Sequence, residues 1–392
     1  MQNLWTNEEA KNYKSDLELR VFTSNLLGRS DELVLHGGGN TSVKSIVDGE
    51  ELLLVKGSGW DLVSIKEEGF APVKLDILQK MAQLEHLSDS DMVSGQKAAM
   101  TDKSAPNPSI EAILHAIIPF KFVDHTHADA VVMISNSDNG EKLIKEVYPN
   151  YLIVPYVMPG FILAKTIYAM TVGLDWDSID GIILHNHGIF TFDDDAKKSY
   201  DKMIEAVSTA ELYLKYNTSI TLNSQRKPYD ISKVTEAISD SKGYEVFTNI
   251  NLGDLALTYS NQNDLENFAT RGVLTPEHII RTKRKPLVLK QDDDINEKLE
   301  EYKKEYEVYF NRYAKDEIIL NATPNYVVIE NFGVVSFGKT QKEANIINDV
   351  VSQTMNAVLR ADQLGGYQSI SEQDSFDMEY WELEQAKLRK QG

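Results

Sequence analysis

The sequence predicts a soluble α/β protein, and three observations support this prediction. Its 392 residues are 42% hydrophobic and 26% charged, with ordinary amounts of glycine and proline, which is typical of a globular protein. Short apolar runs enter glycine-rich turns, as strands do, while longer stretches carry apolar residues at helical spacing. The chain is too long for one typical hydrophobic core, so we expect two domains, or one large domain with an appendage.

The composition excludes several classes of function. The chain has no cysteine, which rules out disulfides, thiolate metal ligands and a cysteine nucleophile. Its formal net charge of −20 argues against nucleic-acid binding, because that affinity comes largely from Lys and Arg on phosphates. The polar start has no apolar signal-peptide core, and Pro159, Gly160 and Lys165 interrupt the apolar stretch 154–174. We therefore expect a cytoplasmic protein with no membrane partner.

The elements of the first half can be assigned in order. Residues 8–27 carry apolar side chains at helical spacing and end at Gly28, a residue favoured after helix C-termini. Two apolar runs follow, LVLHGGGNTSVK and ELLLVKGSGWDL, and each enters a glycine-rich turn. A helix opened by Pro108 and stopped by Pro119 comes next. FVDHTHADAVV and GIILHNHGIFTF then indicate strands, and a helix over about 194–214 follows the second one.

The second half begins with a polar stretch over 216–245, which we interpret as a surface connection. In TPEHIIRTKRKP, Thr275 is the predicted N-cap of a helix with Pro276 at its first position. The last block, about 294–392, has its own helix–strand–strand–helix order. We therefore predict a first domain over residues 1–290 and an α/β extension over residues 291–392.

The last block contains an echo of the first domain. The segment that begins GIILHNHGIFTF at Gly181 aligns without gaps on the segment that begins YVVIENFGVVSF at Tyr326. The matches include Asn186 with Asn331, Gly188 with Gly333, Phe192 with Phe337 and Lys197 with Lys342, whereas Phe332 replaces His187. Two interpretations stay open: a degenerate repeat of the 181–214 unit, or the patterning that all strand–turn–strand–helix units share.

Four of the eight histidines lie in two short motifs, HTH and HNH. Residues two apart on a strand point to the same face, so His125 and His127 look into one space. By the same rule, His185 and His187 share a face if their strand is regular. Three neutral imidazoles around one ion leave a coordination position open, as in catalytic zinc sites. Zn²⁺ is the first choice, with Mn, Fe or Co as alternatives, and a polar strand rim is the competing interpretation.

Glu111 and two glycine-rich turns are further candidates. Glu111 lies in the first turn of the helix that follows Pro108, where a helix N-terminus favours anions. HGGGNTS (36–42) and KGSG (56–59) offer backbone N–H groups, hydroxyls and Lys56, which suit a phosphate. Neither turn fits the P-loop or dinucleotide fingerprint. A surface glutamate and plain tight turns are the competing interpretations.

The order of these motifs resembles that of one known family. GGGNTS, KGSG, PSIE, HTH and NHG follow one another in this way in the class II aldolase/adducin family, and the resemblance covers at least residues 15–215. GGGNTSVK and VKGSGWDL are most similar to the aldolase region of bifunctional rhamnulose-1-phosphate aldolase/alcohol dehydrogenase proteins. The similarity continues through RGVLTPEHIIRTKRKPL to FDMEYWELEQAKL. It implies an α/β/α sandwich with a mostly antiparallel central sheet, plus the C-terminal α/β extension.

The resemblance also implies roles for individual residues. The ligands of a divalent metal, with Zn²⁺ as first choice, would be His125, His127 and His187, and Glu111 would be the acid/base carboxylate. The groups that contact the substrate phosphate would be Asn40, Ser58, Gly59 and Ser109. One position departs from the family, because aldolases often read P-S-S-E and Ile110 replaces the second serine here. The candidates to compensate are the basic residues Arg281, Lys283 and Arg284, for which a solvated basic surface is the competing interpretation.

The reaction implied by the resemblance is the cleavage of a ketose 1-phosphate, of rhamnulose-1-phosphate type, to dihydroxyacetone phosphate and an aldehyde. It would proceed through a metal-stabilised enediolate, with Glu111 moving the proton. A tyrosine often acts on the aldehyde oxygen in the family, and eighteen tyrosines leave that choice open. Sugar-phosphate 4-epimerases and a dehydratase share the scaffold. Adducin-like interaction modules share it too, but they lack the histidine set.

The resemblance finally suggests partners. We expect a homo-oligomer that binds a phosphorylated sugar. In the bifunctional relatives, the segment that matches EYWELEQAKL continues into a short-chain dehydrogenase acting on the aldehyde product. Here Met378, Trp381, Leu383 and Leu388 are predicted to lie on a short helix. We therefore expect the aldolase portion of a longer protein, or a descendant that relies on a separate dehydrogenase.

Overall fold

The computed structural model describes residues 1–383 and divides the chain into two compact units. The first comprises Met1–Ser135 and Gly140–Lys215, and the second comprises Asn136–Asn139 and the chain from Tyr216 onward. The predicted boundary at residue 290 is corrected, because strands that precede it pair within the second unit's sheet. Of the four residues predicted to lie on a terminal helix, only Met378 lies in α16 (Glu372–Glu379); Trp381 and Leu383 lie beyond its end, and Leu388 lies outside the described residues.

The first unit is built on a seven-stranded sheet with the order β3-β2-β1-β4-β7-β6-β5. Only β5 and β6 run parallel to each other, so the sheet is mostly antiparallel, as predicted. The strands are β1 (Asn40–Val47), β2 (Glu50–Lys56), β3 (Phe70–Lys74), β4 (Phe122–Thr126), β5 (Tyr151–Val154), β6 (Gly181–Leu184) and β7 (Gly188–Asp193).

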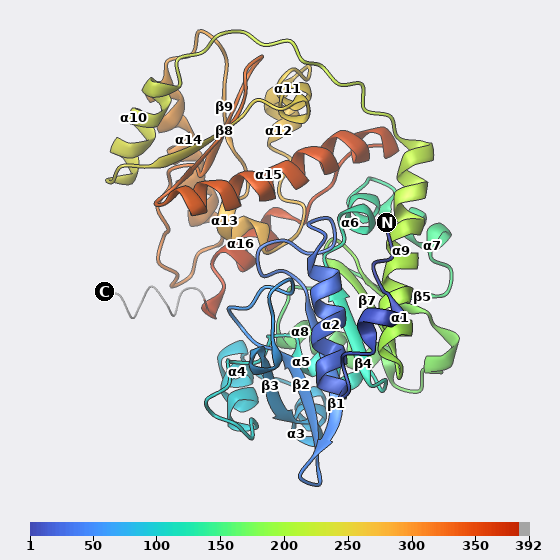
Figure 1. Cartoon of the computed structure of the whole chain (residues 1–392). Coiled ribbons are helices and arrows are strands. Elements are labelled where there is room, and N and C mark those ends of the chain that lie inside the picture. The colour runs from blue at the N-terminus through green and yellow to red at the C-terminus, as the bar shows by residue number, and fades with distance from the viewer. Residues whose placement is uncertain (384–392) are drawn as a thin grey trace. The chain divides into compact units, whose positions relative to one another are not determined.

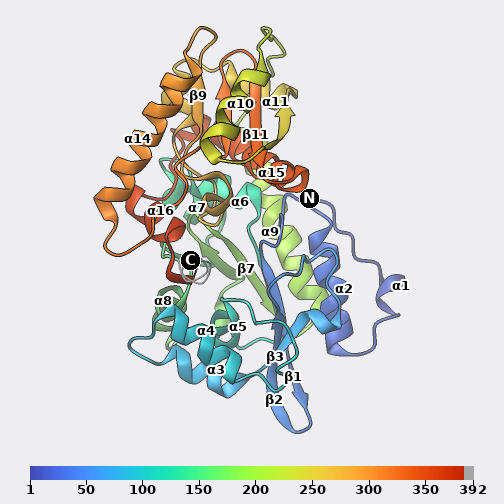
Figure 2. The same cartoon turned by 90° about the vertical axis from the view of Figure 1, so that its left-hand side faces the viewer.

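Helices cover both faces of this sheet. Figure 2 shows α3, α4, α5 and α8 on one side of the strands, and α2 and α9 on the other. Each side has its own apolar core, one formed with α3, α5 and α8 and one formed with α2. The prediction of an α/β/α sandwich is confirmed. The helices are α1 (Asn7–Ala10), α2 (Asp16–Gly28), α3 (Leu75–Ala82), α4 (Asp89–Ala98), α5 (Ala112–Ile117), α6 (Asp129–Ser135), α7 (Gly140–Val147), α8 (Phe161–Thr171) and α9 (Ala196–Asn217).

The predicted helix over 8–27 is two helices, α1 and α2, because Ser15 starts a new one. The Ser15 hydroxyl accepts a hydrogen bond from the backbone N–H of Glu18, and the Glu18 carboxylate accepts one from the backbone N–H of Ser15. This reciprocal arrangement satisfies N–H groups that a helix start leaves unpaired. The predicted end at Gly28 is confirmed. A Cβ there would lie 2.1 Å from the backbone nitrogen of Val63.

A buried ion pair joins the helices of one face to the central strand β4. Arg20 of α2 and Asp124 of β4 are both fully buried and form a short salt bridge. Ser199 of α9 donates a hydrogen bond to the other oxygen of Asp124, at 2.5 Å. Because Asp124 precedes His125 directly, this network fixes the strand that carries the first histidine.

The second unit contains a four-stranded sheet with the order β8-β11-β10-β9, and α15 lies along it (Figure 1). The polar stretch 216–245 is not only a connection, because it contains α10, whose Val234 and Ile238 enter the core. The strands are β8 (Phe247–Asn251), β9 (Leu287–Leu289), β10 (Tyr326–Ile329) and β11 (Gly333–Gly338). The other helices are α10 (Ile231–Lys242), α11 (Asp254–Ser260), α12 (Leu265–Ala269), α13 (His278–Thr282), α14 (Ile295–Tyr313) and α15 (Gln341–Ala361).

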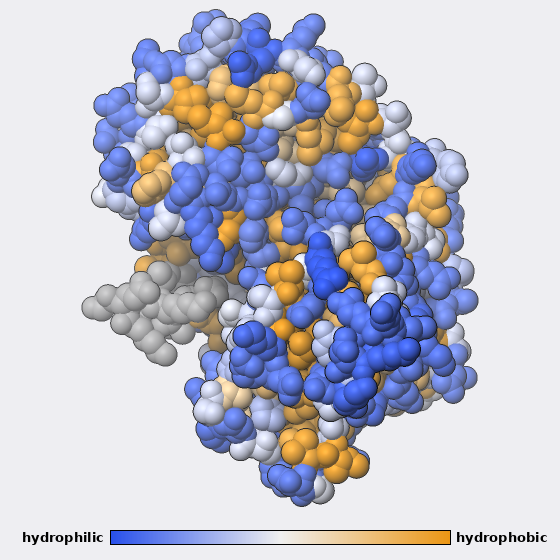
Figure 3. Space-filling view, viewed as in Figure 1, coloured by the Kyte–Doolittle hydropathy of each residue, from blue (hydrophilic) through white to orange (hydrophobic). Residues whose placement is uncertain are grey.

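Large apolar side chains are exposed at several places on the surface (Figure 3). One is at the far end of the β1–β2 hairpin, where Ile46 and Val47 are 72% and 41% exposed and Figure 3 shows an apolar patch. Among residues 1–383, no helix combines the length and the apolar character needed to cross a bilayer.

Candidate metal and acid–base site

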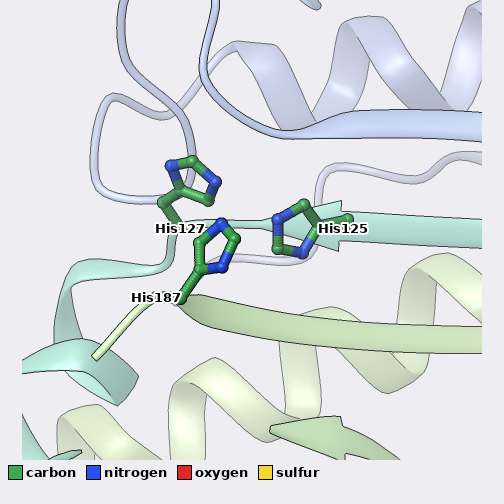
Figure 4. A group of neighbouring side chains, drawn as sticks. All are labelled: His125, His127 and His187. Carbon is green, nitrogen blue, oxygen red and sulfur yellow. The ribbon is translucent and has the colours of Figure 1, made fainter. Parts of the chain in front are cut away.

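Two neighbouring strands bring three imidazoles together. His125 lies on β4, His127 follows that strand directly, and His187 lies in the turn between β6 and β7. Their possible ligand nitrogens all lie within 4.8 Å of one another, and Figure 4 shows the three rings gathered at the strand ends. The sequence spacing predicted that His125 and His127 face the same space. In the structure, the pairing of β4 with β7 also brings His187 to this position.

The HNH motif is a turn rather than a regular strand. Residues 185–187 connect β6 to β7, and Asn186 has a φ of 59°. The expectation that His185 and His187 share one strand face is therefore wrong, and His185 is not part of the three-histidine group. Gly188 allows the close approach of the strands, because a Cβ there would lie 2.3 Å from the carbonyl oxygen of Thr126.

His125 is held in a defined orientation. Its Nδ1 donates a hydrogen bond to the carbonyl oxygen of Ile189 at 3.0 Å, and its ring stacks on Phe190 with centroids 4.1 Å apart. Since the carbonyl oxygen can only accept, Nδ1 carries the proton and the lone pair of the neutral ring is on Nε2. A backbone partner of this kind is common behind histidines that bind metals.

Glu111 lies beside two of these rings. It is the N-cap residue of α5 and is only 4% exposed. Its Oε2 lies 3.4 Å from Nε2 of His125, and its Oε1 lies 3.7 Å from Nε2 of His187. Asn40 donates a hydrogen bond from Nδ2 to Oε2 at 2.6 Å. The carboxylate and the imidazoles therefore form one buried cluster at the end of the sheet.

The sequence analysis missed His115, which is fully buried behind this cluster. Its Nε2 lies 2.5 Å from Oδ1 of Asn40, and its Nδ1 lies 2.8 Å from the hydroxyl of Ser42. The amide nitrogen of Asn40 donates to Glu111, so its oxygen accepts, and Nε2 of His115 carries the proton. Burial holds the pKa of His115 well below its usual value, so the ring stays neutral. The available signal was the four-residue spacing from Glu111, which places both on one helix face.

The first glycine-rich turn lies against the histidines. A Cβ on Gly38 would be 3.4 Å from Nδ1 of His127, and one on Gly39 would be 2.7 Å from the carbonyl oxygen of His125. Lys56 donates a hydrogen bond to the carbonyl oxygen of Gly37 at 3.1 Å. Burial lowers the pKa of Lys56 to about 8, although Asp61 and Glu111 oppose the shift. Lys56, the last residue of β2, is therefore a buried amine that contacts this turn and interacts with Glu111.

The second glycine-rich turn is tied to the segment that precedes Glu111. The backbone N–H of Ser58 donates to the carbonyl oxygen of Asn107 at 2.8 Å, and that of Ser109 donates to the carbonyl oxygen of Lys56 at 3.0 Å. The hydroxyl of Ser109 accepts a hydrogen bond from the backbone N–H of Glu111. Gly59 is exposed and has a φ of +87°, which an L residue rarely adopts. Ser58, Gly59 and Ser109, three of the four predicted phosphate contacts, therefore lie on two segments that are hydrogen-bonded to each other.

The basic residues suggested as compensation lie in the second unit. Lys283 is buried, with Nζ 3.6 Å from Glu379 and 3.9 Å from the ring centre of Tyr306. Arg284 lies 3.7 Å from Glu372. A solvated basic surface is therefore the wrong description of Lys283, and both side chains already face carboxylates.

Comparison with known proteins assigns the fold to a family. Residues 21–214 match the model of the class II aldolase and adducin N-terminal domain, and residues 227–388 match that of the class II aldolase second domain. The N-terminal class II aldolase domain of a conserved protein from Thermoplasma acidophilum is 39% identical, with a TM-score of 0.50, over 55% of this chain and 99% of that one. The chain belongs to the class II aldolase and adducin family.

Other proteins that are similar to this chain are more distant or longer. A Bacillus subtilis (strain 168) protein named uncharacterized oxidoreductase YuxG is 30% identical over 99% of this chain. The chain spans only 60% of the length of that relative. The L-fuculose-1-phosphate aldolase from Thermus thermophilus is 14% identical, with a TM-score of 0.35, over 51% of this chain and 93% of that one.

Proposed function

We propose that this class II aldolase is a metal-dependent lyase that cleaves a ketose 1-phosphate of rhamnulose-1-phosphate type to dihydroxyacetone phosphate and an aldehyde. The observation that carries the proposal is the convergence of three imidazoles with Glu111, whose oxygens lie 3.4 Å and 3.7 Å from two of them. An all-nitrogen set of this kind suits Zn²⁺, which is our choice of metal. His125, His127 and His187 would hold it.

The bound ion would supply positive charge beside the substrate's carbonyl and adjacent hydroxyl oxygens, where negative charge develops. Cleavage breaks the C3–C4 bond, and the electron pair remains on the C3 fragment as an enediolate. Glu111 delivers a proton to C3, which completes dihydroxyacetone phosphate. The hydrogen bond from Asn40 orients the carboxylate for this transfer, and His115 fixes which way the Asn40 amide points. We propose that a tyrosine takes the proton of the C4 hydroxyl, and that this proton returns through solvent to Glu111 for the next cycle.

The phosphate group of the substrate would lie against the two glycine-rich turns. Asn40, Ser58, Gly59 and Ser109 are the proposed contacts, and Lys56 would supply a positive charge in place of the hydroxyl contact that Ile110 lacks. A buried ammonium group attracts an anion strongly because little water screens it. Binding the phosphate far from the breaking bond positions the reacting carbon next to Glu111.

The experiment that tests the proposal is a panel of ketose 1-phosphates, with aldehyde release as the readout. We expect one 1-phosphate to release aldehyde and dihydroxyacetone phosphate in equal amounts. A 4-epimerase would convert the sugar phosphate without releasing either, and a dehydratase would release water instead. No turnover of any member, in protein loaded with metal, would favour an adducin-like interaction module.

The aldehyde product also defines a partner. We propose that a short-chain dehydrogenase, fused or separate, acts on it in the cytoplasm. The support is the name and length of the Bacillus subtilis relative, which extends well beyond the part that matches this chain. A coupled assay with added dehydrogenase and nicotinamide cofactor would show whether product removal drives cleavage forward.

A further inference from the structure

We infer that the second unit is a degenerate copy of the histidine-bearing half of the first, in which apolar side chains have replaced the metal ligands. The strand order β8-β11-β10-β9 repeats the order β4-β7-β6-β5. In both sets the first two pairs are antiparallel and the third is parallel. The inference rests on backbone pairing and holds whatever reaction the first unit catalyses.

The registers of the two sets also agree. The ladder between β4 and β7 has five pairs and starts at Phe122, and the ladder between β8 and β11 has five pairs and starts at Phe247. The two hairpins each have four pairs, which end at Gly188 in one and at Gly333 in the other. A shift by one residue would turn every side chain to the opposite face, so agreement along these two ladders is a strict criterion.

The helices and turns beside the strands agree as well. In each unit a seven-residue helix begins three residues after the first strand ends, α6 in one and α11 in the other. Each hairpin turn has an asparagine at positive φ, 59° at Asn186 and 57° at Asn331. The backbone N–H of each asparagine donates to the serine that ends the helix, to the hydroxyl of Ser135 in one unit and to the carbonyl oxygen of Ser260 in the other.

The correspondence identifies what replaced the ligands. His125 aligns with Ile250, His127 with Leu252 and His187 with Phe332. None of the three replacements can bind a cation. Within the described part of the chain, β8 pairs only with β11, so nothing corresponds to β1–β3, which carry Asn40 and Lys56 in the first unit.

A connecting segment packs against one of the three aligned positions, Phe332, and against the turn that carries it. The backbone N–H of Asn223 donates to Thr258 at 2.8 Å, and that of Lys227 donates to Asn331 at 2.7 Å. The ring of Tyr229 lies 5.8 Å from that of Phe332 and packs on the core of the second unit. The copy therefore keeps the backbone frame of the three-histidine group without its ligands, and Ile250 remains 44% exposed.

Restoring the ligands tests this inference. We would prepare the full chain with Ile250→His, Leu252→His and Phe332→His together, confirm folding by circular dichroism, and count bound Co²⁺ per chain by elemental analysis. We expect one ion more than in the unsubstituted chain, whatever number the latter binds. The additional ion tests the inference about the second unit, whereas the number of ions bound by the unsubstituted chain tests the proposed function. A folded variant with no additional ion would overturn the inference.

Phe332 is buried, so its replacement can prevent folding. A second pair of variants leaves Phe332 unchanged and tests the inference if the triple variant does not fold. Ile250→His with Leu252→His places two imidazoles on the frame of His125 and His127, and Ile250 is 44% exposed. The matched control is Ile250→His with Asn251→His, whose side chains point to opposite faces. We expect the first pair to bind Ni²⁺ at least about tenfold more tightly than the control pair, because its two imidazoles face the same side and can bind one ion together. Equal affinities would overturn the inference.

Discussion

Glu111 connects the parts of the site at the scale of single residues. It occupies the N-cap position of α5, its carboxylate accepts a hydrogen bond from Asn40, and it lies close to two imidazoles. A carboxylate in this position serves either as an acid–base group or as a further ligand of the ion. Removing the negative charge lowers turnover if Glu111 is an acid–base group, and lowers metal content if Glu111 is a ligand.

Replacing Glu111 by Gln keeps the shape and removes the base. We expect metal content to persist while turnover falls by about 10² to 10⁴, the usual contribution of a positioned acid–base group. The measurements are elemental analysis and steady-state kinetics, with exposed Glu85→Gln as the control. Loss of the metal would make Glu111 chiefly a ligand, and unchanged turnover would assign the proton transfer to another residue.

Lys56 gives the site a pH dependence. Its pKa of about 8 means that the side chain is charged below pH 8 and neutral above it. We therefore expect KM for the phosphorylated substrate to rise as the pH increases through about 8, because the anion loses its buried cation. In Lys56→Gln, KM should be high at neutral pH and the step near pH 8 should disappear. The same step in the variant would show that another group controls phosphate binding.

At the scale of elements, β4 is the strand that positions the site, and the Arg20–Asp124 pair anchors it. Removing one partner of a fully buried ion pair leaves an unpaired charge and typically costs about 3–5 kcal/mol. We expect Arg20→Met to lower the free energy of unfolding by about this amount, measured by urea denaturation. Lys80→Met breaks the exposed pair with Asp76 and should change stability little. Equal effects of the two variants would contradict the anchoring role.

The sequence predicted element types better than element ends. The strand that enters HTH and the helix end at Gly28 were predicted correctly, but the segment 122–132, predicted as one strand, is β4 followed by the start of α6 at Asp129. The turn at 185–187 was missed, since only the positive φ of Asn186 distinguishes it from a continuous strand. His115 was missed because an isolated histidine on an apolar helix face resembles any core residue. Its role depends on Asn40 and Ser42, which are distant in sequence.

At the scale of the whole molecule, the chain combines one unit that gathers three histidines with a second unit that we infer to be an incomplete copy of it. The sequence revealed only the hairpin part of the copy, because its glycine and asparagine turn residues persist. Along β8 and α11, only Phe247, Asp254 and Ser260 keep the residues of the first unit. So few matches do not show that β8 pairs with β11, and the domain boundary was therefore predicted at residue 290 although the second unit continues from Tyr216. The expected homo-oligomer remains a prediction.

The measurement that tests the central claim most directly is aldehyde release from rhamnulose 1-phosphate before chelation, after chelation, and after Zn²⁺ is returned. If His125, His127 and His187 hold a catalytic ion, activity is lost with the metal and restored with it. His187→Ala should bind less metal and stay inactive when Zn²⁺ is added, while His86→Ala, at an exposed position, should behave like the unsubstituted chain. Cleavage that continues undiminished in metal-free protein, or in the His187→Ala variant, would contradict the account.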